Sequence, residues 1–165
     1  MTHIIDGIRQ GFEDIVVRAG DTDVLIILTA YMPTFLTLNP KYSHCIILDF
    51  GKGTSRTDID VNQIALTLGL HTCKGMLFLH SLSGCDYSSK IYGTGKTRWL
   101  ELYRSDNPEL AHIPEIFKEL SSSPTEITSE LEQAVTKFIL LVYHCSPGVS
   151  LTRTRMDYLK TTPTR

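Results

Sequence analysis

The chain has 165 residues, of which 42% are hydrophobic and 21% are charged, with a formal net charge of −2. These values are those of one globular domain of ordinary size, long enough to bury a hydrophobic core. The net charge excludes the strong excess of basic residues that many nucleic-acid-binding proteins have. No apolar run approaches the roughly 20 residues of a membrane span, and the first residues lack the pattern of a signal peptide. We therefore expect no membrane partner.

The cysteines are widely spaced and never form a CxxC pair; they are Cys45, Cys73, Cys85 and Cys145. Such spacing indicates reduced thiols rather than a disulfide framework. We therefore expect an intracellular protein, nuclear or cytoplasmic. His71 and His80 lie close to Cys73 and Cys85 in the sequence, but the spacing HxC…HxxxxC matches no common zinc site.

The first part of the chain alternates between helix and strand patterns. Asp60 is placed to cap one of the helices, and Gly11 and Gly69 mark helix ends. The apolar segment 24–28 is too short for periodicity to decide between a helix and a strand. In chain order we expect a helix at 4–12, a strand at 15–17, a polar turn at 18–23, strands at 42–50 and 56–59 joined by a turn at 51–54, and helices at 61–68 and 74–83.

Strand signals fade after residue 88. Helices are expected at 96–104, 114–120, 125–144 and 151–160, with Pro114 suited to a helix start. We therefore predict a single α/β domain over residues 1–165, with an α/β part at 1–87 and a helical part at 88–165.

Two carboxylates, Asp21 and Asp23, follow the strand predicted at 15–17. Carboxylates one residue apart at the end of a strand can turn toward one cation, and they are hard ligands that suit Mg²⁺ or Mn²⁺. Alternatively, Asp21 accepts hydrogen bonds from local backbone amides or caps the next helix. Both interpretations stand at this point.

A DxD sequence also occurs in two other enzyme classes. Phosphatases of the haloacid dehalogenase type need an apolar strand that runs directly into DxDx(T/V). Here residues 18–20 intervene, and Leu25 occupies the last position. Nucleotide-sugar glycosyltransferases usually need a longer parallel sheet before the motif than these 20 residues provide. Both classes are therefore weaker interpretations.

A third acidic residue of interest, Asp86, lies in the sequence LSGCDYSS, at the end of an apolar segment that has the pattern of a helix. In that position its carboxylate could face the same cation as Asp21 and Asp23. The spacing by itself does not require this, because a polar residue is also common in a tight turn between helices.

A glycine pair follows, with basic residues directly after it. Gly93 and Gly95 would let backbone N–H groups approach a phosphate closely at a helix N-terminus, and Lys96 and Arg98 would lie in the first turn of that helix. The alternative is a tight turn with solvated basic side chains. A P-loop is excluded, because its first glycine would fall at position 90, which is lysine.

Together these motifs resemble the flap-endonuclease (XPG/PIN-like) nuclease family. In that family a Gly-Cys-Asp-Tyr turn is followed by an Ile-x-Gly-x-Gly turn and a basic residue, within a helix–two-turn–helix element. Residues 15–28, IVVRAGDTDVLIIL, resemble the family's strand that leads to its second acidic pair. The pattern is most similar to a divergent metazoan branch, often transposon-associated, with VVR-x-x-DTDVL and LH-x-L-(T/S)-GCD.

The resemblance implies a PIN-like, 5′-nuclease-type parallel sheet flanked by helices, with a helix–two-turn–helix and a helical C-terminal extension. It implies a metal-dependent, structure-specific nuclease that acts on DNA or RNA at junctions of single strands and duplexes. It also implies Mg²⁺ or Mn²⁺ as the cofactor, with K⁺ at the helix–two-turn–helix. The residues it assigns are Asp21, Asp23 and Asp86 as catalytic metal ligands and Gly93, Gly95, Lys96 and Arg98 as contacts to the nucleic-acid backbone.

The family's earlier carboxylates have no counterpart here. In the divergent branch an acidic Glu-Glu-Ala-Asp run comes first, and this chain begins with residues 1–4, MTHI, where that run would just have ended. We therefore expect an N-terminally truncated chain with an incomplete or inactive site. The alternative function is a nuclease-dead module that binds nucleic acid or a protein.

Overall fold

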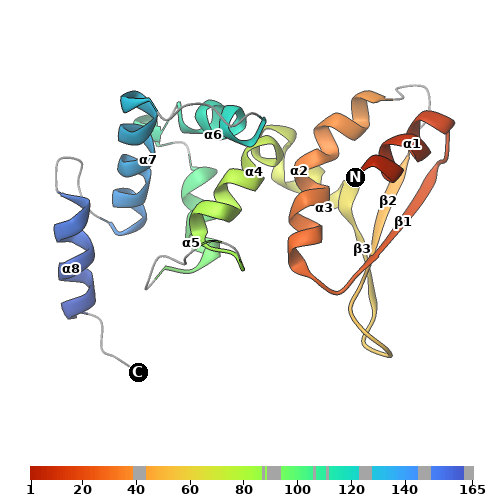
Figure 1. Cartoon of the computed structure of the whole chain (residues 1–165), viewed down its shortest axis with the longest axis horizontal. Helices are drawn as coiled ribbons and strands as arrows, with labels where there is room; N and C mark the ends of the chain where they lie inside the picture. The colour runs from red at the N-terminus through yellow and green to blue at the C-terminus, as the bar shows by residue number, and fades with distance from the viewer. Residues whose placement is uncertain are drawn as a thin grey trace. The chain divides into compact units, whose positions relative to one another are not determined.

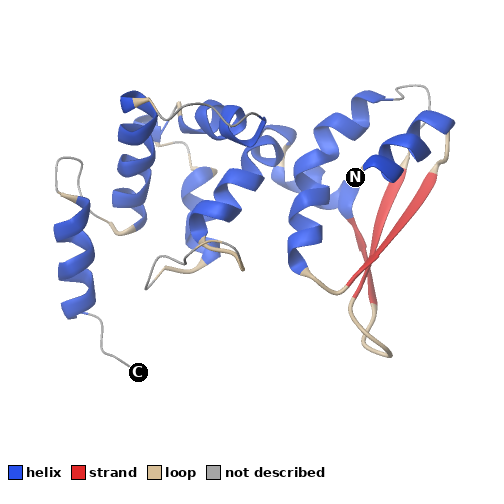
Figure 2. Ribbon diagram, viewed as in Figure 1, coloured by secondary structure: helices blue, strands red, loops and turns tan. Residues whose placement is uncertain are grey.

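The chain forms two compact units, Met1–Leu77 and Phe78–Arg165. All the strands in the described part of the chain belong to the first unit, and the second unit is helical there (Figure 2). The α/β class is therefore confirmed. The computed structural model describes residues 1–38, 44–86, 88, 94–105, 107–110, 112–122, 128–144 and 150–161.

The first unit is built on a three-stranded sheet in the order β1-β2-β3 (Figure 1). Strand β1 runs parallel to β2, whereas β3 returns antiparallel through the predicted hairpin turn. The sheet is therefore mixed, and only its first pair has the parallel arrangement we predicted. The elements of this unit are α1 (Thr2–Gln10), β1 (Asp14–Ala19), α2 (Thr22–Leu38), β2 (Cys45–Phe50), β3 (Thr57–Asp60), α3 (Val61–Leu68) and the start of α4 (Leu70–Ser83).

The apolar segment that periodicity left undecided lies within helix α2. Leu28, Met32 and Phe35 are all buried there. Their spacing of four and three residues places them on one face of a helix. Because α2 extends to Leu38, ten residues past the short apolar segment, the helical period only becomes readable over the longer range.

The core of the first unit centres on the middle strand. Ile46 and Leu48 of β2 are 0% exposed, and helix α3 packs on this strand and on α2. Cys73, at the start of α4, is buried in the same core. Strand β1 differs, because its side chains alternate between exposed and half-buried positions. One face of β1 is therefore covered while the other meets solvent.

The second unit is held by an aromatic cluster. The ring of Phe117 lies 4.6 Å from that of Phe78, 5.3 Å from that of Tyr103 and 5.1 Å from that of Phe138. Trp99 packs on Phe138 with ring centroids 5.8 Å apart. Helices α5, α6 and α8 each contact α7. The elements are the end of α4, α5 (Lys96–Tyr103), the 3-10 turn η1 (Pro108–Leu110), α6 (Ile113–Ser122), α7 (Ser129–Val142) and α8 (Leu151–Thr161).

Each unit contains a helix whose N-terminus is capped by a side chain. Asp60 accepts a hydrogen bond from the backbone N–H of Gln63 at 3.1 Å, which confirms the predicted cap of α3. Thr128 caps α7 in the same way, through the N–H of Leu131 at 3.2 Å. None of the helices in the described ranges has the length and apolar character needed to cross a membrane.

Candidate functional site

Asp21 and Asp23 lie together in the first unit, at the junction of β1 and α2. Asp21 is exposed and Asp23 half-buried. The junction lies beyond the carboxyl end of a strand in the parallel pair β1-β2. In open α/β sheets this is the end at which ligands bind, because the loops that follow the strands gather there.

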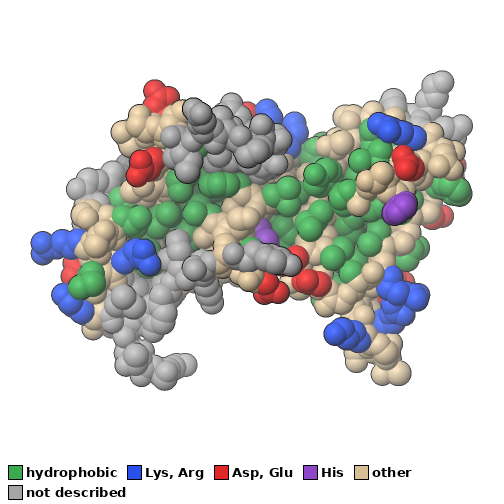
Figure 3. Space-filling view, in the orientation of Figure 1, with side chains coloured by type: hydrophobic (Ala, Val, Ile, Leu, Met, Phe, Trp, Pro, Cys, Tyr) green, Lys and Arg blue, Asp and Glu red, His purple; other side chains and the backbone are tan. Residues whose placement is uncertain are grey.

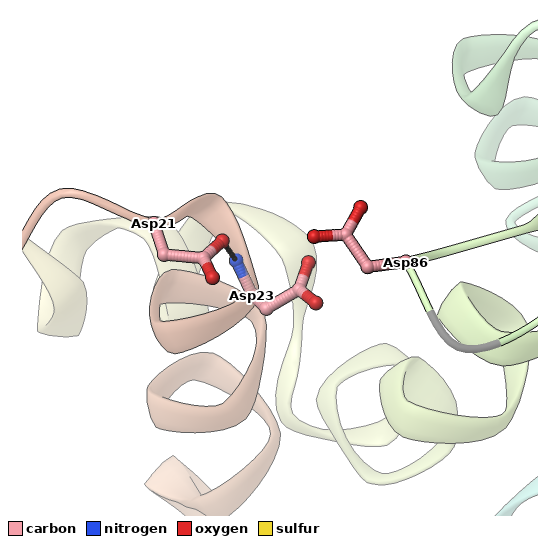
Figure 4. Close-up of side chains that lie close together, drawn as sticks. All are labelled: Asp21, Asp23 and Asp86. Atoms are coloured by element: carbon pink, nitrogen blue, oxygen red, sulfur yellow. Dashed lines mark hydrogen bonds between the residues drawn. The ribbon is translucent and has the colours of Figure 1, made fainter.

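Asp21 also has a structural role at this junction. Its Oδ1 accepts a hydrogen bond of 2.9 Å from the backbone N–H of Asp23 (Figure 4), and its main-chain oxygen accepts one from Val24. Asp21 therefore caps α2, which confirms one of the two interpretations of this residue. The capping hydrogen bond is made by Oδ1. The second oxygen, Oδ2, is not needed for the cap, so the same carboxylate can cap the helix and bind a cation.

The charge at this junction favours a cation despite the helix N-terminus. A helix N-terminus carries about half a positive charge, which by itself favours an anion. The two carboxylates of Asp21 and Asp23 bring two negative charges to the same place. The net charge remains negative, and the donors are the hard oxygens that Mg²⁺ and Mn²⁺ prefer.

A lysine that the sequence interpretation missed lies beside this junction. The side chain of Lys52, on the turn between β2 and β3, crosses over Gly20, and its Cε would be 3.3 Å from a Cβ placed there. A larger residue at position 20 would displace Lys52. Lys and Arg side chains are also conspicuous around this hairpin in the space-filling view (Figure 3). The sequence signal that could have indicated Lys52 was the turn Gly51-Lys52-Gly53, which we interpreted only as the connection between two strands.

Asp49 of β2 is another carboxylate of the first unit, but both of its oxygens are already bound. Arg18 Nε donates to Oδ2 at 2.9 Å, and Arg56 Nε donates to Oδ1 at 3.0 Å. The Asp49 side chain is 13% exposed, so these two partners compensate a largely buried charge. Asp49 therefore stabilises the sheet and is a poor candidate for a metal ligand.

Asp86 belongs to the second unit, in the turn that follows α4, and its side chain is exposed. The turn is closed by two backbone hydrogen bonds between Cys85 and Ser88, of 3.3 and 3.2 Å. Ser88 Oγ also donates to the main-chain oxygen of Ser81 in α4 at 2.6 Å. These bonds hold the backbone of Asp86 against the end of α4, and Figure 4 shows its carboxylate leaving this turn.

The predicted phosphate contacts lie at the start of α5, also in the second unit. Helix α5 begins at Lys96, as expected, with Gly95 at its N-cap. Gly95 is exposed, and no atom lies within 4 Å of where a Cβ would be. The backbone is therefore open to an approaching group on that side. Gly93 lies outside the described residues.

The two cations of α5 each lie beside a histidine. Lys96 Nζ is 3.4 Å from Nδ1 of His80, and Arg98 Nη2 is 3.2 Å from Nδ1 of His144. These contacts span 16 and 46 residues of sequence, so no local pattern could have indicated them. They keep the two basic side chains near α5 rather than free in solvent.

Cys73, one of the cysteines near the histidines, has a structural role. Cys73 is 0% exposed in the core of the first unit, and its Sγ donates to the main-chain oxygen of Ala65 at 3.8 Å. Burial raises the pKa of the Cys73 thiol, which disfavours the thiolate that zinc binds. Burial, followed by the charges of Asp60 and Asp14, also raises the pKa of Cys45.

The predicted site residues therefore divide between the units, with Asp21 and Asp23 in the first and Asp86, Gly95, Lys96 and Arg98 in the second. Acidic groups occupy a strand-to-helix junction in one unit. In the other, an acidic turn and a basic helix start follow each other along the chain. No protein-family model, curated protein or solved structure matches this chain.

Proposed function

We propose that this chain is a PIN-like, divalent-cation-dependent nuclease domain, in which Asp21, Asp23 and Asp86 are ligands of one Mg²⁺ or Mn²⁺. The observation that carries the proposal is the pair of carboxylates at the carboxyl end of β1. The proposal requires that the two units bring Asp86 to this pair.

The chemistry of the donors supports this cofactor. Mg²⁺ binds oxygen ligands, keeps several waters and uses only a few carboxylates together with substrate phosphates. Asp21 and Asp86 are exposed and Asp23 is half-buried, so their carboxylates leave room for such waters and for a phosphate. A bound ion would supply Lewis-acid activation of a water for in-line attack on a phosphodiester. The chain's own contribution is to hold the carboxylates: Asp21 through the α2 cap and Asp86 through the Cys85–Ser88 turn.

The second unit supplies the features that suit the nucleic-acid backbone. The exposed N-terminus of α5 offers backbone N–H groups, and Lys96 and Arg98 add positive charge within its first turn. A backbone phosphate bound there would bring its single negative charge close to both cations. The K⁺ that the resemblance implies belongs to the helix–two-turn–helix, whose residues 89–93 lie outside the described part of the chain.

The test is Mn²⁺ binding and cutting of flap or hairpin DNA by the purified full chain. We expect Asp23→Asn and Asp86→Asn each to weaken Mn²⁺ binding at least about tenfold, since losing one ligand charge removes more than about 1.4 kcal/mol of attraction. The matched control is Asp6→Asn, an exposed carboxylate on α1, which precedes β1. Because the site is expected to be incomplete, Mn²⁺ binding is the primary readout; any cutting by wild type should disappear in the two site variants and persist in the control.

Equal Mn²⁺ affinity in Asp86→Asn and wild type would contradict a shared site. In that case the second candidate function gains support: a nucleic-acid-binding module without catalysis, favoured by the open, basic start of α5. That function predicts DNA binding that weakens in Lys96→Ala but not in Lys118→Ala. Lys118 is the matched control because it is a lysine of α6 whose side chain is 41% exposed and is paired with Glu115.

A further inference from the structure

Strand β1 has an outer edge with hydrogen-bonding groups that point away from the sheet. Glu13 O accepts from Cys45 N–H before the strand, and Ala19 O accepts from Gly51 N–H at its end. Because backbone groups alternate sides along a strand, the odd-numbered residues of β1 face β2. The N–H and C=O groups of Asp14, Val16 and Arg18 therefore face the opposite edge, and β1 is the outermost strand of the described sheet.

The same three residues carry the exposed side chains of β1. Val16 is 64% exposed, which is unusual for an apolar residue in the middle of a strand. Asp14 and Arg18 lie two residues away on either side, on the same face, and both are exposed. The edge therefore presents an acid, an apolar residue and a base at equal spacing.

We propose that this edge pairs with the same edge of a second copy of the chain, antiparallel and centred on Val16. A two-fold axis at Val16 places it opposite its own copy, and it places Asp14 opposite Arg18 in both directions. Since all three residues have outward-facing backbone groups, each opposing pair would exchange hydrogen bonds. The result is a continuous six-stranded sheet across an isologous interface.

The charges select this register among the symmetric alternatives. An axis at position 14 would place Asp14 opposite Asp14, and an axis at position 18 would place Arg18 opposite Arg18. Axes at 15 or 17 would leave the charges opposite Val16 or residues outside the strand. Like charges directly opposed across strands are destabilising, whereas opposite charges stabilise. Only the register centred on Val16 pairs every charge of the edge.

Arg18 can take part without losing its partner within the chain. It contacts Asp49 through Nε, and its side chain is 72% exposed. The guanidinium has further N–H donors, so its Nη groups remain suited to a carboxylate across the interface. Asp49 also orients Arg18 in advance, which lowers the entropy lost on pairing.

The experiment is sedimentation velocity of the full chain over a range of concentrations up to about 100 μM, a range matched to weak protein association. We expect wild type to move toward twice the 18.5 kDa mass of the chain as concentration rises. Asp14→Lys, which places a lysine opposite Arg18, and Val16→Lys, which opposes two lysines, should each raise the dimer dissociation constant at least about tenfold. Asp58→Lys is the matched control, because it makes the same charge change on β3, the other edge strand.

Circular dichroism establishes that each variant is folded, and both altered residues of β1 are exposed, so folding should be kept. A wild type that stays monomeric over the whole concentration range would overturn the proposal. The edge would then be available for pairing with a strand of another protein. A dimer that persists in both Asp14→Lys and Val16→Lys would also overturn it, because association would then use another surface. A dimer lost equally in Asp58→Lys would show a general charge effect and overturn the assigned edge.

Discussion

The two units of this chain bury their apolar residues in different ways. The first covers a mixed sheet with helices, and its core is mainly aliphatic and sulfur-containing. The second has no described strand and gathers five aromatic rings from α4, α5, α6 and α7, with Phe117 at the centre. Aliphatic side chains suit the flat, pleated surface of a sheet, whereas large rings fill the irregular space between crossing helices.

The polar groups of the proposed site follow this division. In the first unit they lie where a strand ends and a helix begins, so the sheet positions them. In the second they lie in turns around α4 and α5, so their placement depends on helix packing. A change in one core should therefore disturb one part of the site more than the other, which makes the comparison testable.

The largest expected effect is loss of the aromatic core of the second unit. Phe138 is 0% exposed and contacts Trp99 and Phe117, so Phe138→Ala should lower the free energy of unfolding by about 3–5 kcal/mol. Guanidinium unfolding followed by the fluorescence of Trp99, the only tryptophan of the chain, measures this directly. Phe12→Ala is the matched control, since Phe12 is 59% exposed in the first unit. Equal losses in the two variants would contradict the assigned core.

A smaller effect is expected from the charge cluster of the sheet. Asp49→Asn keeps the volume but removes the charge that holds Arg18 and Arg56, and it should cost about 1–2 kcal/mol, because both arginines are partly exposed to solvent. Far-UV circular dichroism during urea unfolding gives the value. Added salt should narrow the difference between variant and wild type. A stability unchanged by the substitution would mean that the ion pairs contribute nothing net.

The smallest effects sharpen the comparison by removing one helix cap in each unit. Asp60→Ala and Thr128→Ala should each lower the free energy of unfolding by about 1 kcal/mol, while Asp60→Asn and Thr128→Ser retain a capping oxygen and lose less. If the units unfold separately, Thr128→Ala shifts the transition reported by Trp99, and Asp60→Ala shifts only the transition seen by circular dichroism. Coincident shifts in both variants would instead indicate one cooperative unit.

Features that depend on neighbouring residues were predictable. The cap at Asp60, the helix it starts, the hairpin after Phe50 and the beginning of α5 at Lys96 all agree with the expected positions. The parallel sheet implied by the resemblance is present in the pair β1-β2, whereas β3 returns antiparallel through the expected hairpin. A short hairpin makes the two strands that it joins antiparallel, so the turn at 51–54 already implied a mixed sheet.

Features that depend on distant residues were not predictable. Arg18 and Asp49 are 31 residues apart, and they meet only because β1 and β2 pair in one particular parallel register. His80 and Lys96 likewise lie together through the packing of helices. Hydrophobic periodicity does not say which distant elements pair or pack, so neither contact can be inferred from the pattern of the chain.

The sequence by itself determined the alternation of elements, the acidic turn after β1 and the basic start of α5, because propensity, capping and turn chemistry act over a few residues. Only the tertiary structure decided that Asp21 caps α2, that Asp49 is already neutralised and that β1 presents an acid, an apolar residue and a base along an open edge. Those outcomes depend on which strands pair and in which register. Long-range packing sets both.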